Sequence, residues 1–83
     1  GKTTIVPTNV ISLRRWERVT EDGSTMKRIY ITTDVGTFFY DIVKNRWASN
    51  ADSPNEIVDV DSLKALAFAK AGVDNETEFA KFC

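Results

Sequence analysis

The chain has 83 residues, of which 42% are apolar and 28% charged, a balance that suits one folded domain and excludes an intrinsically disordered chain. It has no histidine and one cysteine, Cys83, which excludes histidine-dependent nucleophiles, thiolate zinc sites and intrachain disulfides. Its net charge of −1 combines a basic half, residues 1–50 with eight basic and five acidic side chains, and an acidic half, residues 51–83 with three basic and seven acidic ones.

The first half of the chain predicts β-strands joined by tight turns. Residues 1–9 are β-prone but contain Pro7, so we expect an edge strand or an extended lead-in. Alternating β-branched, aromatic and charged residues predict three further strands, over Val10–Val19, Met26–Thr33 and Thr37–Val43. A short fourth strand through Trp47 is expected after a turn at Lys44-Asn45.

The second half predicts helices. A loop over Asn50–Asn55 and an extended segment over Glu56–Val60 lead to Asp61, the expected N-cap of a helix that runs to about Ala71 and ends at Gly72. This helix is apolar nearly all round, so we expect it to be largely buried against the sheet. A second short helix should begin at Asn75, with Glu78 three residues on as its capping partner. Phe79 and Phe82 are expected to point into the core.

The predicted fold class is therefore α+β. We expect a single α+β domain over residues 1–83, an antiparallel three- to four-stranded β-meander packed against a C-terminal helix and a short second helix. One cysteine in so small a domain favours a reducing compartment, so we expect a cytoplasmic protein. No apolar run approaches the roughly 18 residues that a membrane-spanning helix needs, so no membrane association is expected.

The Asp22-Gly23 dipeptide predicts the pairing register of the first hairpin. Asp-Gly between two strand-like runs is typical of a two-residue type I′ turn, in which both central residues take positive φ. Such a turn pairs Val19 with Met26, Glu17 with Arg28, Arg15 with Tyr30, and Trp16 with Ile29. One unfavourable pair results, because Arg18 then faces Lys27. In the second hairpin, a turn centred on Val35-Gly36 pairs Ile31 with Tyr40, and Ile29 with Ile42.

Alternation along the strands divides the side chains between two faces. The face beneath the helix is expected to hold Trp16, Ile29, Ile31, Phe38, Tyr40 and Ile42. The opposite face is expected to hold Leu13, Arg15, Glu17, Arg28, Tyr30, Phe39, Asp41 and Val43. The candidate binding residues on it are Arg15, Arg28, Tyr30 and Phe39, because arginines interleaved with aromatic rings suit binding to proteins and to nucleic acids. A slip of the register by one residue would exchange the faces and bring Arg14 and Trp16 to the site instead.

No catalytic apparatus is recognisable, so we expect a non-enzymatic module for protein interaction or self-association that acts through this arginine and aromatic face. A nucleic-acid-binding domain that uses the same face is the alternative, although a pI near 5.3 is low for that class. Glu17 and Asp41 are the only carboxylate pair that the register brings onto one face. Arg15 and Arg28 beside them favour an ion-pair network over acid–base catalysis.

No cofactor and no metal ion are expected. Asp52, Glu56, Asp59 and Asp61 form an acidic stretch, but it lacks the glycine that a twelve-residue calcium loop needs. Gly1-Lys2-Thr3-Thr4 resembles the end of a phosphate-binding loop without the earlier glycine, preceding strand and following helix of that motif. A homodimer linked through Cys83 stays open as an alternative.

Overall fold

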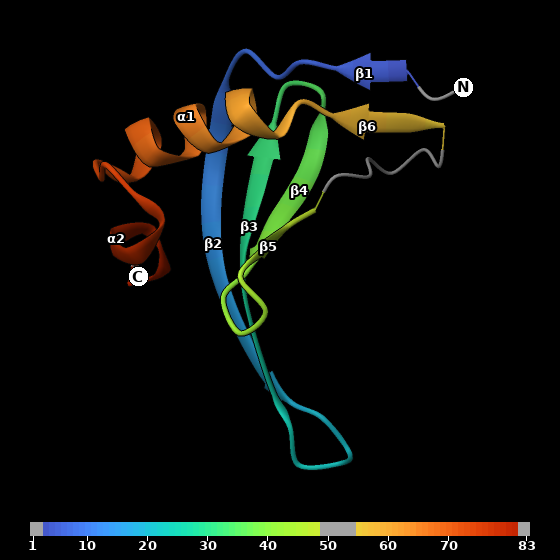
Figure 1. The fold of residues 1–83 in the computed structure, drawn as a ribbon, viewed down its shortest axis with the longest axis vertical. Helices are drawn as coiled ribbons and strands as arrows, with labels where there is room; N and C mark the ends of the chain where they lie inside the picture. The colour runs from blue at the N-terminus through green and yellow to red at the C-terminus, as the bar shows by residue number, and fades with distance from the viewer. Residues whose placement is uncertain (1–2, 49–54, 82–83) are drawn as a thin grey trace.

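The main sheet is an antiparallel meander, as predicted. The computed structural model describes residues 3–48 and 55–81, and Figure 1 shows its layers. Four strands form this sheet in the order β2-β3-β4-β5, namely β2 (Val10–Val19), β3 (Thr25–Thr33), β4 (Gly36–Asp41) and β5 (Arg46–Trp47). The β2–β3 hairpin projects well beyond the other elements (Figure 1). The predicted Asn50–Asn55 loop lies, apart from its last residue, outside the described residues.

A second, two-stranded sheet joins the start of the described chain to the segment before the first helix. Strand β1 (Thr3–Ile5) pairs in parallel with β6 (Glu56–Val58). Hydrogen bonds extend this pairing at both ends of β6. The amide of Thr3 donates to the carbonyl of Asn55 at 2.9 Å, and the amide of Asp59 donates to the carbonyl of Ile5 at 2.8 Å. The expected lead-in is thus a strand, but its partner lies more than 50 residues away in sequence.

Both helices lie on one face of the main sheet (Figure 1). Helix α1 (Val60–Ala71) has Asp59 at its N-cap, two residues before the position predicted, and ends at Gly72, which takes a left-handed conformation with φ of 73°. Only Leu63 and Ala67 of this helix are buried, so the expectation of a largely buried helix is wrong. Its alanines extend the apolar surface around the helix, but only one side of it meets the sheet.

The short helix α2 (Glu76–Ala80) begins where the capping pattern places it. The side chain of Asn75 accepts a hydrogen bond from the amide of Glu78 at 2.9 Å, which satisfies one of the free amides of the first turn. Phe79 is fully buried, as expected, and Phe82 lies outside the described residues.

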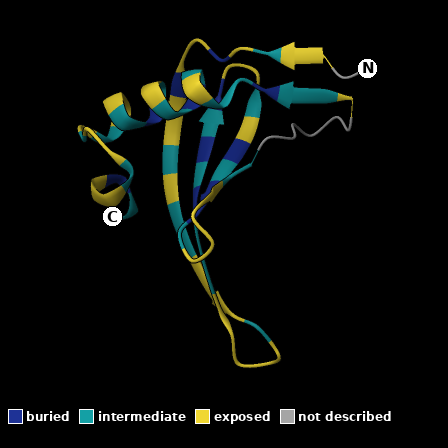
Figure 2. Cartoon of the chain, in the orientation of Figure 1, coloured by how far each residue is buried: buried dark blue, intermediate teal, exposed yellow. Residues whose placement is uncertain are grey.

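The core lies between α1, α2 and the inner face of the main sheet. Figure 2 shows the buried residues concentrated on β3, β4 and the facing sides of the helices, with an exposed hairpin tip. Tyr40, Trp47 and Phe79 form an aromatic cluster in this core, with ring centroids 4.7 Å apart for Tyr40–Trp47 and 5.4 Å for the stacked Trp47–Phe79 pair. The buried apolar residues are Val10, Ile29, Ile31, Phe38, Tyr40, Val58, Leu63, Ala67 and Phe79.

A polar cluster closes the edge of this aromatic core. Glu76 accepts hydrogen bonds from the Lys64 ammonium at 2.8 Å and the Trp47 indole at 2.9 Å. These two contacts lower the pKa of Glu76, the ammonium more than the indole. Desolvation, and to a smaller extent the nearby Glu76 carboxylate, raises the pKa of Tyr40. The Tyr40 hydroxyl donates a hydrogen bond to the side chain of Asn45 at 2.8 Å. The cluster therefore joins β4, β5, α1 and α2 on the inner side of the sheet.

The register of the first hairpin differs from the prediction by one residue. Val19 pairs with Thr25, Trp16 with Arg28 and Arg15 with Ile29. The loop holds three residues rather than two, because the amide of Thr20 donates to Ser24 at 2.8 Å and that of Gly23 to Thr20 at 3.0 Å. Gly23 takes positive φ, of 86°, but Asp22 does not. A turn followed by one left-handed residue is the usual geometry of a three-residue hairpin loop.

Local hydrogen bonds explain why the longer loop forms. One oxygen of the Asp22 carboxylate accepts from the Thr20 hydroxyl and from the amide of Ser24. These bonds lower the pKa of Asp22 to about 2, and the bond from the Thr20 hydroxyl contributes most. They hold Asp22 at negative φ, whereas a type I′ turn would force this residue into the left-handed region, which costs about 1 kcal/mol or more outside glycine.

The second hairpin is offset by two residues, which changes the partners but preserves the faces. Thr33 pairs with Gly36, so the turn residues are Asp34 and Val35, and Ile31 faces Phe38 rather than Tyr40. Because side chains alternate with a period of two, Ile29, Ile31, Phe38 and Tyr40 remain on the inner face, as expected, and all four are buried.

Candidate functional site

The candidate site is the face of the main sheet turned away from the helices, here called the outer face. Besides Ser12, Thr32 and Thr37, alternation and the observed register place on it the side chains of Arg14, Trp16, Arg18, Met26, Arg28, Tyr30, Phe39, Asp41 and Arg46. Arg14, Tyr30 and Phe39 form one row across three strands, and Trp16, Arg28, Asp41 and Arg46 form the next row across four.

Three aromatic rings of the outer face contact one another. Trp16 and Tyr30 meet edge to face with centroids 6.1 Å apart, and Tyr30 and Phe39 lie 5.8 Å apart at a tilt of 52°. All three side chains are half-buried by their neighbours. Such pairs are each worth about 0.5–1.5 kcal/mol beyond their buried area. The rings therefore form a preorganised apolar strip across the centre of the sheet.

Arg28 is held against this strip. Its guanidinium carbon lies 4.2 Å from the centroid of Phe39, within the range of a cation–π contact, and its Nη1 donates a long hydrogen bond of 3.3 Å to the hydroxyl of Tyr30. The Nε of Arg28 is buried and has no hydrogen-bond partner among the described residues. The side chain is thus fixed in orientation while part of its donor capacity is unused.

The outer face is strongly positive. Four arginines, Arg14, Arg18, Arg28 and Arg46, stand against one carboxylate, Asp41, which gives a net charge of +3. Within residues 3–48 and 55–81, none of these arginines forms an ion pair. Asp41 is only 7% exposed, and its Oδ1 accepts from the amide of Lys44 at 3.0 Å. The face therefore presents guanidinium groups whose charge is not neutralised within the described chain.

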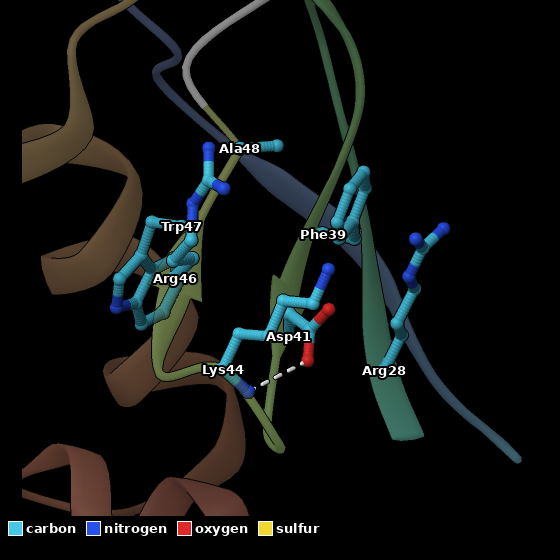
Figure 3. Close-up of a pocket in the computed structure, with 7 residues that line it drawn as sticks. All are labelled: Arg28, Phe39, Asp41, Lys44, Arg46, Trp47 and Ala48. Carbon is cyan, nitrogen blue, oxygen red and sulfur yellow. Dashed lines mark hydrogen bonds between the residues drawn. The ribbon is translucent and has the colours of Figure 1, made fainter. Parts of the chain in front are cut away.

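A pocket of about 270 Å³ lies at the β4–β5 end of the outer face (Figure 3). In Figure 3, Arg28 lies on one side of it and Arg46 with Trp47 on the other, while Phe39, Asp41 and Lys44 lie between them. Its lining residues come from β3, β4, β5, the turn before β5 and Ala48 directly after it. Three cations and one carboxylate line it.

The structure places three of the four predicted binding residues together. Arg28, Tyr30 and Phe39 lie side by side on the outer face, and their role in binding stays a prediction. Arg15 does not lie there, and its predicted position is wrong. The extra loop residue turns it to the inner face, where its Nη1 donates to the carbonyl of Ala80 at 2.8 Å and its Nε to Glu17 at 3.3 Å. Arg15 therefore anchors α2.

Arg14 and Trp16 occupy the outer face in its place, as expected for a register slip of one residue. Trp16 had been assigned to the inner face and Leu13 to the outer one, and the structure reverses both assignments. A bulge at Ile11, between the pairs of Val10 and Ser12, lets both Val10 and Leu13 pack against the core.

One signal in the sequence favours the observed register. In it, Glu17 faces Lys27 and Arg18 faces Met26, which removes the like-charge pair of Arg18 with Lys27. Thr20 and Ser24, two residues either side of Asp22, are a second signal, because both supply donors to its carboxylate. Together they could also have identified Arg18 as an outer-face residue. Lys44 and Arg46 carry no comparable signal, because Lys44 lies in the turn before β5 and Arg46 in a strand of two residues.

The alternative chemistries gain no geometric support. Glu17 and Asp41, predicted to share a face, lie on opposite faces because of the same register change. Among the described residues, no cluster of three or more acidic or cysteine side chains could hold a metal ion. Asp52 of the acidic stretch, Lys2 and Cys83 lie outside those residues. No helix in the described ranges is long and apolar enough to cross a membrane.

Comparison with known proteins gives no match, whether to protein-family models, to curated proteins or to solved structures. Function is therefore inferred from the geometry and charge of the outer face.

Proposed function

We propose that this protein is a non-enzymatic interaction module that binds an acidic segment of a partner protein through the outer face. The observation that carries the proposal is the strip of Trp16, Tyr30 and Phe39, in mutual contact and flanked by arginines, on a face that no described helix covers. Tryptophan, tyrosine and arginine are the residues most enriched among those that dominate the free energy of protein association.

The charge of the outer face favours an acidic partner over a second copy of the same face. Two copies docked outer face to outer face would bring a charge of +3 against +3 in a partly desolvated interface, which is unfavourable. Self-association would instead need the outer face of one copy to meet the acidic second half of another. Such a contact joins two different surfaces, so it would produce rings or open chains of molecules rather than a two-fold dimer built on one shared surface.

Binding to single-stranded nucleic acid is the second candidate. Trp16 and Tyr30 could stack on bases, and the arginines without ion-pair partners could contact phosphates. Against this candidate stands the net charge of −1 for the whole chain, since nucleic-acid-binding domains are usually clearly basic. The two candidates predict different responses to salt.

The test compares two charge reversals. Arg14 is exposed on the outer face, and Lys70 is exposed on α1 on the opposite side of the molecule. Arg14→Glu and Lys70→Glu change the net charge equally, so Lys70→Glu is the matched control. Immobilised wild-type protein and Lys70→Glu should retain the same proteins from a cell extract, and Arg14→Glu should lose them. Equal retention by all three proteins would contradict the proposal.

Salt distinguishes the two partner classes. A complex that depends on phosphate contacts loses affinity steeply as salt rises, by about 10³-fold or more between 50 and 200 mM when six or more phosphates are bound. An interface anchored by aromatic rings should change far less over the same range. Fluorescence titration of the wild type with a single-stranded oligonucleotide at both salt concentrations tests this directly. Tight binding with a steep salt slope would favour nucleic acid. Light scattering coupled to size-exclusion chromatography measures the molar mass in solution, which gives the oligomeric state of the protein.

A further inference from the structure

The pocket at the β4–β5 edge has the composition of an anion site. It lies at the end of the row that runs from Trp16 through Arg28 and Asp41 to Arg46, so it is continuous with the outer face. Phe39 and Trp47 supply aromatic rings to its lining. Arg28 is half-buried in it, whereas Lys44 and Arg46 are exposed to solvent.

The charge of the pocket matches a doubly charged anion. Arg28, Lys44 and Arg46 supply three positive charges and Asp41 one negative charge, a net of +2. A phosphomonoester carries about −1.5 to −2 at neutral pH, whereas a carboxylate or one phosphodiester carries only −1. Asp41 already accepts the amide of Lys44, so one of its oxygens is engaged within the chain.

One cation of the pocket is held in orientation, and the other two lack ion-pair partners within the described residues. The guanidinium of Arg28 is held by Phe39 and Tyr30, so little conformational entropy remains to be lost when it binds a ligand. Neither Lys44 nor Arg46 forms an ion pair within the described part of the chain. Arginine presents its N–H groups as a planar fork that binds two phosphate oxygens at once, and lysine adds a point charge.

From these observations we infer that the pocket is a subsite for a phosphate monoester on the bound partner, that is, a phosphorylated side chain in the segment held by the outer face. The inference rests on the proposed function for the identity of the partner. It adds that Arg28, Lys44 and Arg46 bind the phosphate group, while the Trp16, Tyr30 and Phe39 strip binds the rest of the segment.

The test uses phenyl phosphate as the probe in a nitrogen–proton NMR titration of the full chain. Amides of Lys44 to Ala48 and the side-chain Nε of Arg46 should shift together and saturate. Arg46→Gln should weaken binding about tenfold. Lys70→Gln, a matched loss of one positive charge from α1 and away from the outer face, should leave the affinity for phenyl phosphate within twofold of wild type. Equal weakening by both variants, or shifts spread over all basic residues, would overturn the subsite.

Two further titrations identify the class of anion. Acetate should bind at least tenfold more weakly than phenyl phosphate, and the affinity for phenyl phosphate should rise between pH 5 and pH 7.5 as its second ionisation, with a pKa near 6, is completed. Tighter binding of oligothymidine than of phenyl phosphate would replace the monoester with a nucleic-acid backbone. Acetate binding as tight as phenyl phosphate would overturn the phosphate assignment.

The failures of the two proposals are distinguishable. If Arg14→Glu abolishes partner retention but phenyl phosphate does not bind, the outer face is an interface without a phosphate subsite. If phenyl phosphate binds and Arg46→Gln weakens it, while Arg14→Glu and Lys70→Glu retain partners equally, the pocket is a phosphate site in a protein whose outer face does not bind the partner.

Discussion

Replacing Trp16 and Tyr30 by alanine, singly and together, measures which face of the sheet Trp16 occupies. In the structure the two rings meet edge to face at 6.1 Å on the outer face. The double-mutant cycle should therefore give a coupling free energy of about 0.5–1.5 kcal/mol, the usual value for such a ring pair. Both side chains are half-buried rather than enclosed, so the lower half of that range is expected.

A second cycle, on Arg15 and Tyr30, is the matched control. These residues were predicted to face each other, but the structure places Arg15 on the inner face, bound to the carbonyl of Ala80. Because the sheet separates the two side chains, their single-mutant losses should add, with a coupling energy of zero within about 0.3–0.5 kcal/mol. Each single substitution still lowers stability, because each removes contacts of its own.

Urea denaturation followed by circular dichroism gives the free energies of unfolding for both cycles. A chain of this length is expected to be stable by roughly 4–12 kcal/mol, so losses of a few kcal/mol remain measurable. A coupling for Arg15 with Tyr30 that exceeds the coupling for Trp16 with Tyr30 would refute the three-residue loop and with it the composition of the outer face.

Three further predictions concern the elements that support the face. Phe79→Ala should lower the free energy of unfolding by about 3–5 kcal/mol, the usual cost of truncating a fully buried phenylalanine. It should also change the fluorescence of Trp47, on which the Phe79 ring stacks. A loss below 1 kcal/mol would show that α2 is not docked as described. Gly72→Ala should lower the free energy of unfolding by about 1–2 kcal/mol, measured by thermal or urea denaturation. The loss comes from φ of 73°, which strains any residue with a Cβ atom, because nothing lies within 4 Å of the added atom. A neutral result would mean that α1 ends elsewhere. Hydrogen bonds from Thr8, then Asn9, lower the pKa of Asp34 from 3.8 to about 2. This carboxylate therefore stabilises the folded state above pH 4 and ceases to do so as the pH falls through 2. The difference in urea midpoint between wild type and Asp34→Ala should be full at pH 6 and vanish near pH 2, and a difference that does not change with pH would contradict this.

Local chemistry in the sequence was enough to predict most elements. The bounds of β2 were predicted without error, because β-branched and aromatic residues run from Val10 to the turn-forming residues after Val19. Gly72 marked the end of α1 because a residue without a Cβ atom adopts the left-handed conformation easily, and Asn75 marked the start of α2 by the hydrogen bond that its side chain accepts. The buried apolar residues of β3 and β4 were also predicted, because an offset of two residues leaves every side chain on the same face.

Tertiary structure alone decided which side chains of β2 lie on the outer face of the sheet. The Asp22-Gly23 dipeptide fits loops of two or of three residues, and one extra residue reverses the direction of every side chain on the strand. The observed loop satisfies Asp22 with local hydrogen bonds and turns Leu13 towards the core, and the bulge at Ile11 lets Val10 pack there as well. The β1–β6 pairing and the Arg15–Ala80 contact join segments more than 50 residues apart. A pattern within a few residues does not specify such contacts, because they depend on how the whole chain packs.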